Sequence, residues 1–170
     1  AKRVITVSQF SKMELGHYLK IKESKITVIP EGCEHILRAE MDNSILDKFS
    51  LHGQPFLLAV GSSSLHKNVN SVVKAMNLPH EKLPNLVIAG GNFSKVFSKM
   101  DSSQDEGIIR LGYVTDGQLR ALYENAVAFI FPSLYEGFGL PPLEAMSCGC
   151  PVICSNRASI PEICGDAVLY

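Results

Sequence analysis

The sequence lacks an apolar run near the roughly 18 residues that a membrane-spanning helix needs. It also lacks a surplus of basic residues, because its formal net charge is −1. The balanced charge leaves no electrostatic surface for nucleic acid. Charged residues make up only 19% of the chain and hydrophobic residues 46%. This composition excludes a disordered chain, and the 170 residues predict one folded domain with part of a second.

Paired cysteine motifs are also missing, since no CxxC occurs. The five cysteines are Cys33, Cys148, Cys150, Cys154 and Cys164, and four of them lie late in the chain inside apolar stretches. Such thiols are typical of a reduced, cytoplasmic protein, where they are buried. The five histidines are not spaced to complete a metal site with them. We therefore expect no metal.

Short β-rich runs, apolar at nearly every position, alternate with longer mixed segments. This pattern suits strands that are buried on both faces of a parallel sheet. Alternating strands and helices imply right-handed crossovers, and so predict an α/β fold with a Rossmann-like, doubly wound parallel sheet. The predicted strands are Val4–Val7, Ile26–Ile29, Phe56–Val60, Leu86–Ala89, Ile108–Leu111, Val127–Phe131 and Val152–Cys154.

Four helix starts are visible between the strands. Ser11 begins a capping-box pattern that opens a helix to about residue 20, and Asn68 caps a helix to about residue 77. Thr115 begins a second capping box. Pro141 and its neighbour open a further helix that Gly149 stops.

One boundary is visible along the chain. Residues 36–55 lack a clean period and end in a turn-rich stretch, so they predict a linker. Residues 1–35 then form a short strand–helix–strand piece, and residues 56–170 form the main domain. The chain stops after an apolar run without a closing helix, so we expect this domain to be truncated at its C-terminus.

The segment with the clearest chemistry follows the predicted strand that ends at Phe131. Gly137 and Gly139 let a ligand approach the backbone, and the helix start at Pro141 suits an anion such as a diphosphate. Glu136 and Glu144 lie eight residues apart and suit sugar hydroxyls. Taken alone, each glutamate could simply stabilise a turn or a helix start.

Three further strand-to-helix loops could also line a ligand site. The first contains Gly61 and Lys67, and the lysine suits a phosphate as a point charge. It is not a Walker A loop, because GxxxxGK[ST] is absent. The second contains Gly90 and the third Tyr113; each is either a ligand contact or an ordinary connection.

These residues together resemble glycosyltransferase family 4, whose members have the GT-B architecture of two facing Rossmann-like domains. The resemblance covers nearly the whole chain. Its segments are VSQFSK and VIPEGCE, LAVGSSSLHKN, LVIAGG, IIRLGYVTDGQLRALYENA and PSLYEGFGLPPLEAMSCGCPVI. The last contains the Glu-x7-Glu motif. The resemblance implies that residues 1–35 are the tail of an acceptor-side domain, and that residues 56–170 bind a nucleotide sugar.

The resemblance also implies roles for single residues. Glu144 would hold the ribose and Glu136 the transferred sugar, while Lys67 would neutralise the diphosphate leaving group. Lys67 and Glu136 would thus be the catalytic residues. The implied donor-binding set is Gly61, Ser62, Lys67, Gly90, Tyr113, Val114, Glu136, Gly137, Phe138, Gly139, Leu140 and Glu144.

Family members retain the anomeric configuration and need no metal or other cofactor. The resemblance implies transfer of a hexose to a glycan or lipid-linked acceptor in polysaccharide biosynthesis. A peripheral contact with the inner face of the membrane, through a further domain, stays open. Ser62 stands where many relatives have Arg, so one expected cation is missing. Asn68 and Leu140-Pro141-Pro142 are similar to a mannosyltransferase subgroup, which favours GDP-mannose over a UDP-sugar as donor.

Two other functions fit the same fold. One is a non-catalytic nucleotide-binding module, and the other is a GT-B nucleotide-sugar epimerase. An epimerase would need an acid–base pair that we cannot identify in the sequence. A hydride-transferring dehydrogenase is disfavoured, because no GxGxxG follows any predicted strand.

Overall fold

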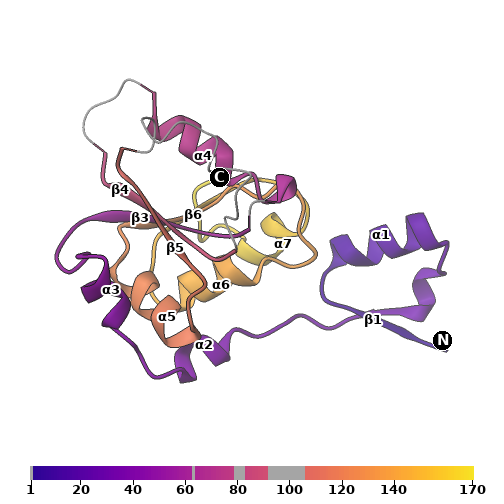
Figure 1. Cartoon of the computed structure of the whole chain (residues 1–170). Coiled ribbons are helices and arrows are strands. Elements are labelled where there is room, and N and C mark those ends of the chain that lie inside the picture. Colours follow the sequence, from indigo (N-terminus) through magenta and orange to yellow (C-terminus); the bar gives the residue numbers. More distant parts are fainter. Residues whose placement is uncertain (1, 63, 79–82, 92–105) are drawn as a thin grey trace.

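The computed structural model describes residues 2–62, 64–78, 83–91 and 106–170. Two bodies of unequal size are visible (Figure 1). The smaller body, here called the N-terminal piece, is a two-stranded parallel sheet of β1 (Val4–Thr6) and β2 (Ile26–Val28), with helix α1 (Gln9–Leu19) and the 3-10 turn η1 (Glu23–Lys25) between them. An extended segment joins it to the larger body, here called the main domain.

The main domain is built on a five-stranded parallel sheet with the order β5-β4-β3-β6-β7. Its strands are β3 (Phe56–Val60), β4 (Asn85–Ala89), β5 (Ile108–Gly112), β6 (Ala128–Phe131) and β7 (Val152–Cys154). All seven predicted strands are present, and the doubly wound α/β prediction is confirmed. The strand order reverses between β3 and β6, because the chain first builds β4 and β5 on one side and then β6 and β7 on the other.

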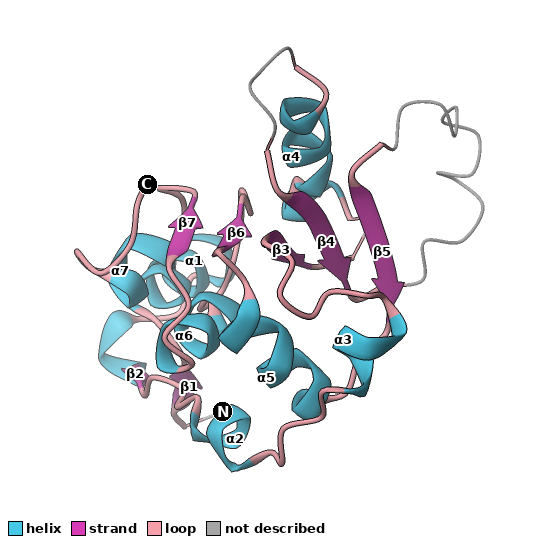
Figure 2. Cartoon of the chain, turned by 90° about the vertical axis from the view of Figure 1, so that its left-hand side faces the viewer, coloured by secondary structure: helices cyan, strands magenta, loops and turns pink. Residues whose placement is uncertain are grey.

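Each face of the main sheet buries its own apolar cluster. Helix α4 (Val69–Met76) covers one face, where Val69, Val72 and Val73 pack with alternate residues of β3 and β4. Helices α5 (Asp116–Asn125) and α6 (Leu140–Ser147) cover the other face (Figure 2). Strand β3 serves both clusters, since Leu58 points to one and Ala59 to the other. Burial on both faces explains why its sequence is apolar at every position.

Helix starts agree with the sequence to different degrees. Thr115 makes the full predicted capping box with Gln118, and Leu140, Pro141 and Pro142 open α6. The prediction for α1 is wrong by one turn. Ser8 is its N-cap, accepting the backbone amide of Ser11, so the helix begins three residues before the predicted box. The capping Ser at residue 8 takes precedence because its backbone is extended, as an N-cap requires.

Residues 36–55 are not an irregular connection in the structure. They contain most of α2 (Glu34–Arg38) and all of α3 (Ser44–Lys48), both of which lie against α5. Their apolar residues Ile36, Ile45, Leu46 and Leu51 are buried in the main core. Arg120 of α5 donates to the carbonyls at the end of α2. Helices of five residues are too short to show the periodicity on which sequence reasoning depends.

The remaining elements complete the described chain. The 3-10 turn η2 (Leu65–Lys67) precedes α4, and α7 (Ile160–Cys164) follows β7. Helix α7 was not predicted, and it packs its buried Ile160 and Cys164 into the main core. Within the described ranges, no helix is both long enough and apolar enough to cross a membrane.

Candidate functional site

The strand order of the main sheet reverses between β3 and β6, and the loops that follow these two strands begin at that point. In open α/β sheets, ligands bind in this crevice beyond the carboxyl ends of the strands. The loop after β3 is here called the lysine loop (residues 61–68), and the loop after β6 the glycine loop (residues 132–139). Ser63 of the lysine loop lies outside the described residues.

Lys67 and Glu136 meet across this crevice. The lysine Nζ lies 2.7 Å from the glutamate Oε1, although the two residues are 69 positions apart in the chain. Their side chains are 23% and 15% exposed, and the ammonium group lies 5.5 Å from the centre of the Phe131 ring. The structure therefore brings together, as a charged pair, the two residues to which the resemblance assigned catalytic roles.

Two hydrogen bonds hold the loops together beside this pair. The amide of Leu134 donates to the carbonyl of His66 at 2.7 Å, and the Asn68 side chain donates to the carbonyl of Pro132 at 3.3 Å. Asn68 is the N-cap residue of α4, as predicted, although its side chain makes no capping hydrogen bond. It has a left-handed backbone (φ 52°) that aims its amide group across the crevice instead. Its role is to join the two loops.

The glycine loop turns its carbonyl groups into the protein. Ser159 is fully buried, and its hydroxyl contacts both the Glu136 carbonyl at 2.9 Å and the Phe138 carbonyl at 2.6 Å. Gly139 then enters α6 with φ 110°, a conformation that favours glycine. Among the described residues, none accepts a hydrogen bond from the amides of residues 137–139. A loop with engaged carbonyls and available amides, at the positive end of α6, suits an anion.

Glu144 is held more tightly than the sequence suggested. Only 6% of the residue is exposed, and its two carboxylate oxygens have separate protein contacts. His35 Nε2 lies 2.8 Å from Oε1, and the Tyr123 hydroxyl donates to Oε2 at 3.1 Å. Burial raises the pKa of the Tyr123 phenol well above its usual value, and the charge of Glu144 adds to this. Glu144 therefore also connects α6 to α5 and to the start of α2.

Gly90, which was predicted to contact the donor, also has a structural reason to be glycine. Gly90 and Gly91 both have positive φ angles, 97° and 69°. A β-carbon at Gly90 would lie 3.3 Å from the carbonyl oxygen of Gly61, and one at Gly91 would lie 3.1 Å from the Ser62 α-carbon. These glycines let the turn after β4 pack against the lysine loop. Their backbone freedom is needed for the fold whether or not a ligand binds.

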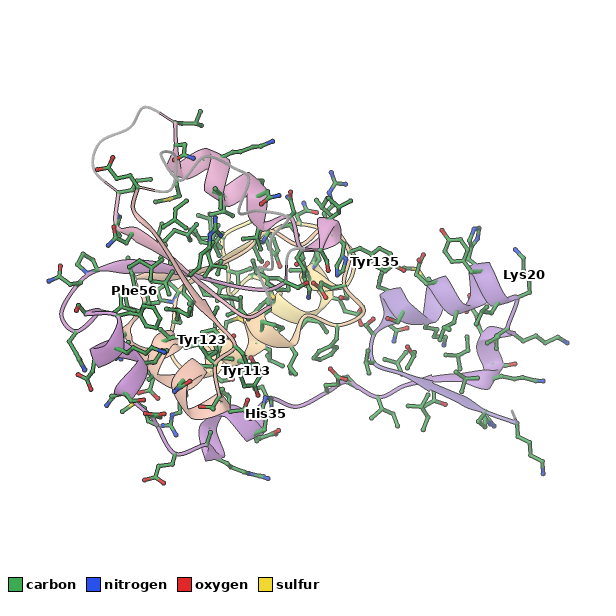
Figure 3. The ribbon with its side chains drawn as sticks, viewed as in Figure 1. Lys20, His35, Phe56, Tyr113, Tyr123 and Tyr135 are labelled. Carbon is green, nitrogen blue, oxygen red and sulfur yellow. The ribbon has the colours of Figure 1, made fainter. Side chains whose placement is uncertain are left out.

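Two other candidates lie at the end of β5. Gly112 has a positive φ of 74°, and its carbonyl accepts the amide of Gly90 at 2.7 Å. Tyr113 is largely exposed, and Val114 packs at the edge of the main core. Figure 3 labels Tyr113 in the main domain, between the labels of Tyr123 and His35. Within the described part of the chain, no hydrogen bond or ion pair joins Tyr113 to Lys67 or Glu136.

A cavity of about 550 Å³ borders the two loops. Its lining includes Asn68, Pro132 and Leu134 of the two loops, and residues 153–157 at the end of β7 and directly after it. Within the described ranges, no group of three or more His, Cys, Asp or Glu side chains is placed to hold a metal ion.

Sequence reasoning missed three residues that form hydrogen bonds to the predicted site residues. His35, Tyr123 and Ser159 each reach a site residue from an element distant in sequence. None carries a local signal, since a lone histidine, tyrosine or serine has many ordinary uses. The one local hint is that Tyr123 directly follows Ala121 and Leu122, since a tyrosine buried with such neighbours needs a partner for its hydroxyl.

Comparison with known proteins places this geometry in context. Residues 42–169 match the family described as glycosyl transferases group 1. The chain is 38% identical, over 99% of its length, to O-antigen chain mannosyltransferase B of Escherichia coli. It is 31% identical to O-antigen chain mannosyltransferase RfbU of Salmonella typhimurium, over 99% of its length. The chain spans only 47% and 46% of these two curated relatives, about half of each.

Solved structures support the same fold. HepE of Anabaena, in complex with UDP and glucose, superposes with a TM-score of 0.78 at 20% identity, over 95% of this chain and 46% of that one. Sucrose-phosphate synthase of Thermosynechococcus elongatus gives 0.79 at 23% identity, over 99% and 45%. At these identities the comparison concerns the fold, and it supports the prediction of one half of a GT-B architecture.

Proposed function

This chain belongs to the group 1 glycosyl transferases, and from that premise we propose that it forms the donor-binding half of a retaining glycosyltransferase. The proposed reaction transfers a hexose from a nucleotide-diphosphate sugar to a glycan or lipid-linked acceptor. The observation that carries the proposal is the Lys67–Glu136 pair at the point where the strand order reverses. A charged pair in that crevice offers a cation for phosphate and an anion for hydroxyl groups.

Each described group then has a part in binding the donor. Lys67 binds the diphosphate, and the amides of residues 137–139 at the start of α6 bind the sugar or phosphate oxygens. Glu136 accepts hydrogen bonds from the sugar hydroxyls. The ribose lies towards Glu144, and the base lies along Tyr113 and Val114. Since Lys67 is paired with Glu136 before the donor binds, the diphosphate must compete for its ammonium group.

The chemistry follows from the movement of charge. When the anomeric carbon–oxygen bond breaks, the electron pair stays with the diphosphate, and the sugar becomes oxocarbenium-like. Lys67 and the positive end of α6 stabilise the growing negative charge. The departing phosphate takes the proton of the acceptor hydroxyl, whose oxygen bonds to the anomeric carbon on the same face. No metal ion and no protein nucleophile enter this scheme.

Donor and location are proposed from the relatives and the composition. Both curated relatives described above are named as mannosyltransferases, which favours a mannose donor, and GDP-mannose in particular. HepE was crystallised with UDP, so UDP-sugars are the alternative. The reduced thiols suit the cytoplasm, where nucleotide sugars would reach the site. A peripheral membrane contact through a further domain is compatible with a lipid-linked acceptor.

Titration calorimetry of this chain tests the proposal. GDP and UDP are titrated separately, each with and without a chelator of divalent cations. We expect binding of at least one nucleotide that the chelator leaves unchanged, and loss of that binding in Lys67→Ala. Binding that vanishes on chelation would contradict the metal-independent site. Failure of both nucleotides to bind would favour a non-nucleotide role for the crevice.

A further inference from the structure

Ser8 is fully buried, although it belongs to the small N-terminal piece, whose helix α1 has no buried residue of its own. The main domain covers it. Its hydroxyl donates to the carbonyl of Gly137 in the glycine loop at 2.5 Å. Ser11 Oγ donates to the same carbonyl oxygen at 2.8 Å. A carbonyl oxygen has two lone pairs, so the N-terminal piece satisfies this carbonyl of the loop completely.

Glu162 makes a second connection between the two bodies. The amides of Gln9 and Phe10 donate to its two carboxylate oxygens, at 2.7 and 3.1 Å. First-turn amides have no acceptor inside their own helix, and α1 has no acidic residue in its first turn. A carboxylate also suits the positive end of the helix. Helix α1 therefore takes part of its N-terminal cap from α7 of the main domain.

Tyr135, the neighbour of Glu136, contacts the same helix. Its ring lies edge-on to Phe10, with ring centres 5.4 Å apart, and its hydroxyl donates to Glu14 at 2.6 Å. In Figure 3, Tyr135 lies on the side of the main domain that faces α1. The N-terminal piece thus contacts the glycine loop at Tyr135 and at Gly137, the two residues that flank Glu136.

We infer that Ser11 and Glu162 are positioning residues that couple the docking of the N-terminal piece to the binding of donor. When α1 is docked, the hydroxyls of Ser8 and Ser11 both donate to the Gly137 carbonyl. These two hydrogen bonds fix the orientation of the peptide plane between Gly137 and Phe138. The Phe138 amide of the same plane then points away from α1, as an anion-binding amide must. Undocking removes two donors from the carbonyl, and the plane can rotate. The identity of the ligand in this inference rests on the proposed function. The contacts between α1 and the glycine loop do not.

Nuclear magnetic resonance of the whole chain tests the geometry without any ligand. We compare Ser11→Ala, Ser11→Thr and Glu162→Gln with the control variants Ser24→Ala and Glu23→Gln, which alter exposed residues of the N-terminal piece. In Ser11→Ala and Glu162→Gln, the amide shift of Phe138 should change and residues 136–139 should become more mobile. Ser11→Thr keeps the hydroxyl and should restore both. Amides of Gln9 and Phe10 should exchange about 3- to 10-fold faster in Glu162→Gln, because the glutamine amide keeps only one acceptor oxygen and no charge.

Calorimetry with GDP and UDP then tests the coupling. Ser11→Ala should bind the preferred nucleotide about 2- to 10-fold more weakly, Ser11→Thr should bind nearly as the unmodified chain, and the controls should not differ. An unchanged Phe138 shift in Ser11→Ala would overturn the inference, and so would a changed shift with unchanged affinity. If the unmodified chain binds neither nucleotide while the loop responds as expected, the proposed function fails and the structural coupling stands.

Discussion

Lys67 and Glu136 form an ion pair at 2.7 Å, so under the proposed function Glu136 competes with the diphosphate of the donor for the ammonium group. Replacing Glu136 by Gln removes this competition and one negative charge from the crevice. We expect Glu136→Gln to bind bare GDP or UDP about 2- to 10-fold more tightly than the unmodified chain. In a protein that also contains the acceptor side, the same change should lower kcat, because the sugar loses a charged acceptor.

Calorimetry and steady-state kinetics measure these two effects separately. Lys67→Ala is the matched comparison, and it should weaken nucleotide binding and lower kcat together. Weaker binding of the bare nucleotide by Glu136→Gln would place the nucleotide, not the sugar, against Glu136.

Glu144 depends on Tyr123, which is fully buried and donates to its carboxylate. Tyr123→Phe removes only the hydroxyl and leaves the carboxylate short of one donor in a buried place. We expect the free energy of unfolding to fall by about 1–3 kcal/mol, measured by urea denaturation. Tyr18→Phe is the control, because Tyr18 is largely exposed. Equal stability of the two variants would mean that the Tyr123–Glu144 contact contributes nothing to the fold.

At the scale of elements, α5 begins with a full capping box, which no other described helix has. Thr115 accepts the Gln118 amide, and the Gln118 side chain accepts the Thr115 amide. Thr115→Ala should therefore cost about 1 kcal/mol of stability. Thr115→Ser keeps the hydroxyl and should cost much less, so thermal denaturation of the two variants isolates the cap. A loss as large in Thr115→Ser would point to packing of the methyl group instead.

Elements also differ in how far the sequence predicted them. Strand β3 was located to the residue, because burial on both faces leaves a continuous apolar run. The start of α1 was misplaced, because Ser8 and Ser11 are both acceptable caps and only the extended backbone at Ser8 distinguishes them. Helices α2 and α3 were missed because neither completes two turns.

At the scale of the whole molecule, we expect the buried thiols to lower the free energy of unfolding at alkaline pH. Burial raises the pKa of Cys150 from 9.0 to about 11 and that of Cys154 to about 12. Between about pH 9 and 11, the unfolded chain has lost thiol protons that the folded chain keeps. The unfolded state then binds fewer protons, so the free energy of unfolding should fall as pH rises through this window.

Urea denaturation at pH 8, 9 and 10, in the presence of a reductant, measures this effect. The double variant Cys150→Ala and Cys154→Ala should show a flatter dependence on pH, even though it is less stable at pH 8. A slope that is the same with and without these thiols would assign the alkaline loss to other groups, such as the buried Tyr123 phenol.

The sequence by itself determined the seven strands, the capped α5, the proline-opened α6 and the two loops that carry Lys67 and Glu136. Each depends on neighbours within a few residues, through burial period, caps or backbone angles. The tertiary structure alone decided which distant groups meet. Lys67 pairs with Glu136 across 69 residues, His35 contacts Glu144 across 109, and Glu162 caps Gln9 across 153. These pairings follow from the order of strands in the sheet and from the docking of α1, which hydrophobic periodicity does not encode.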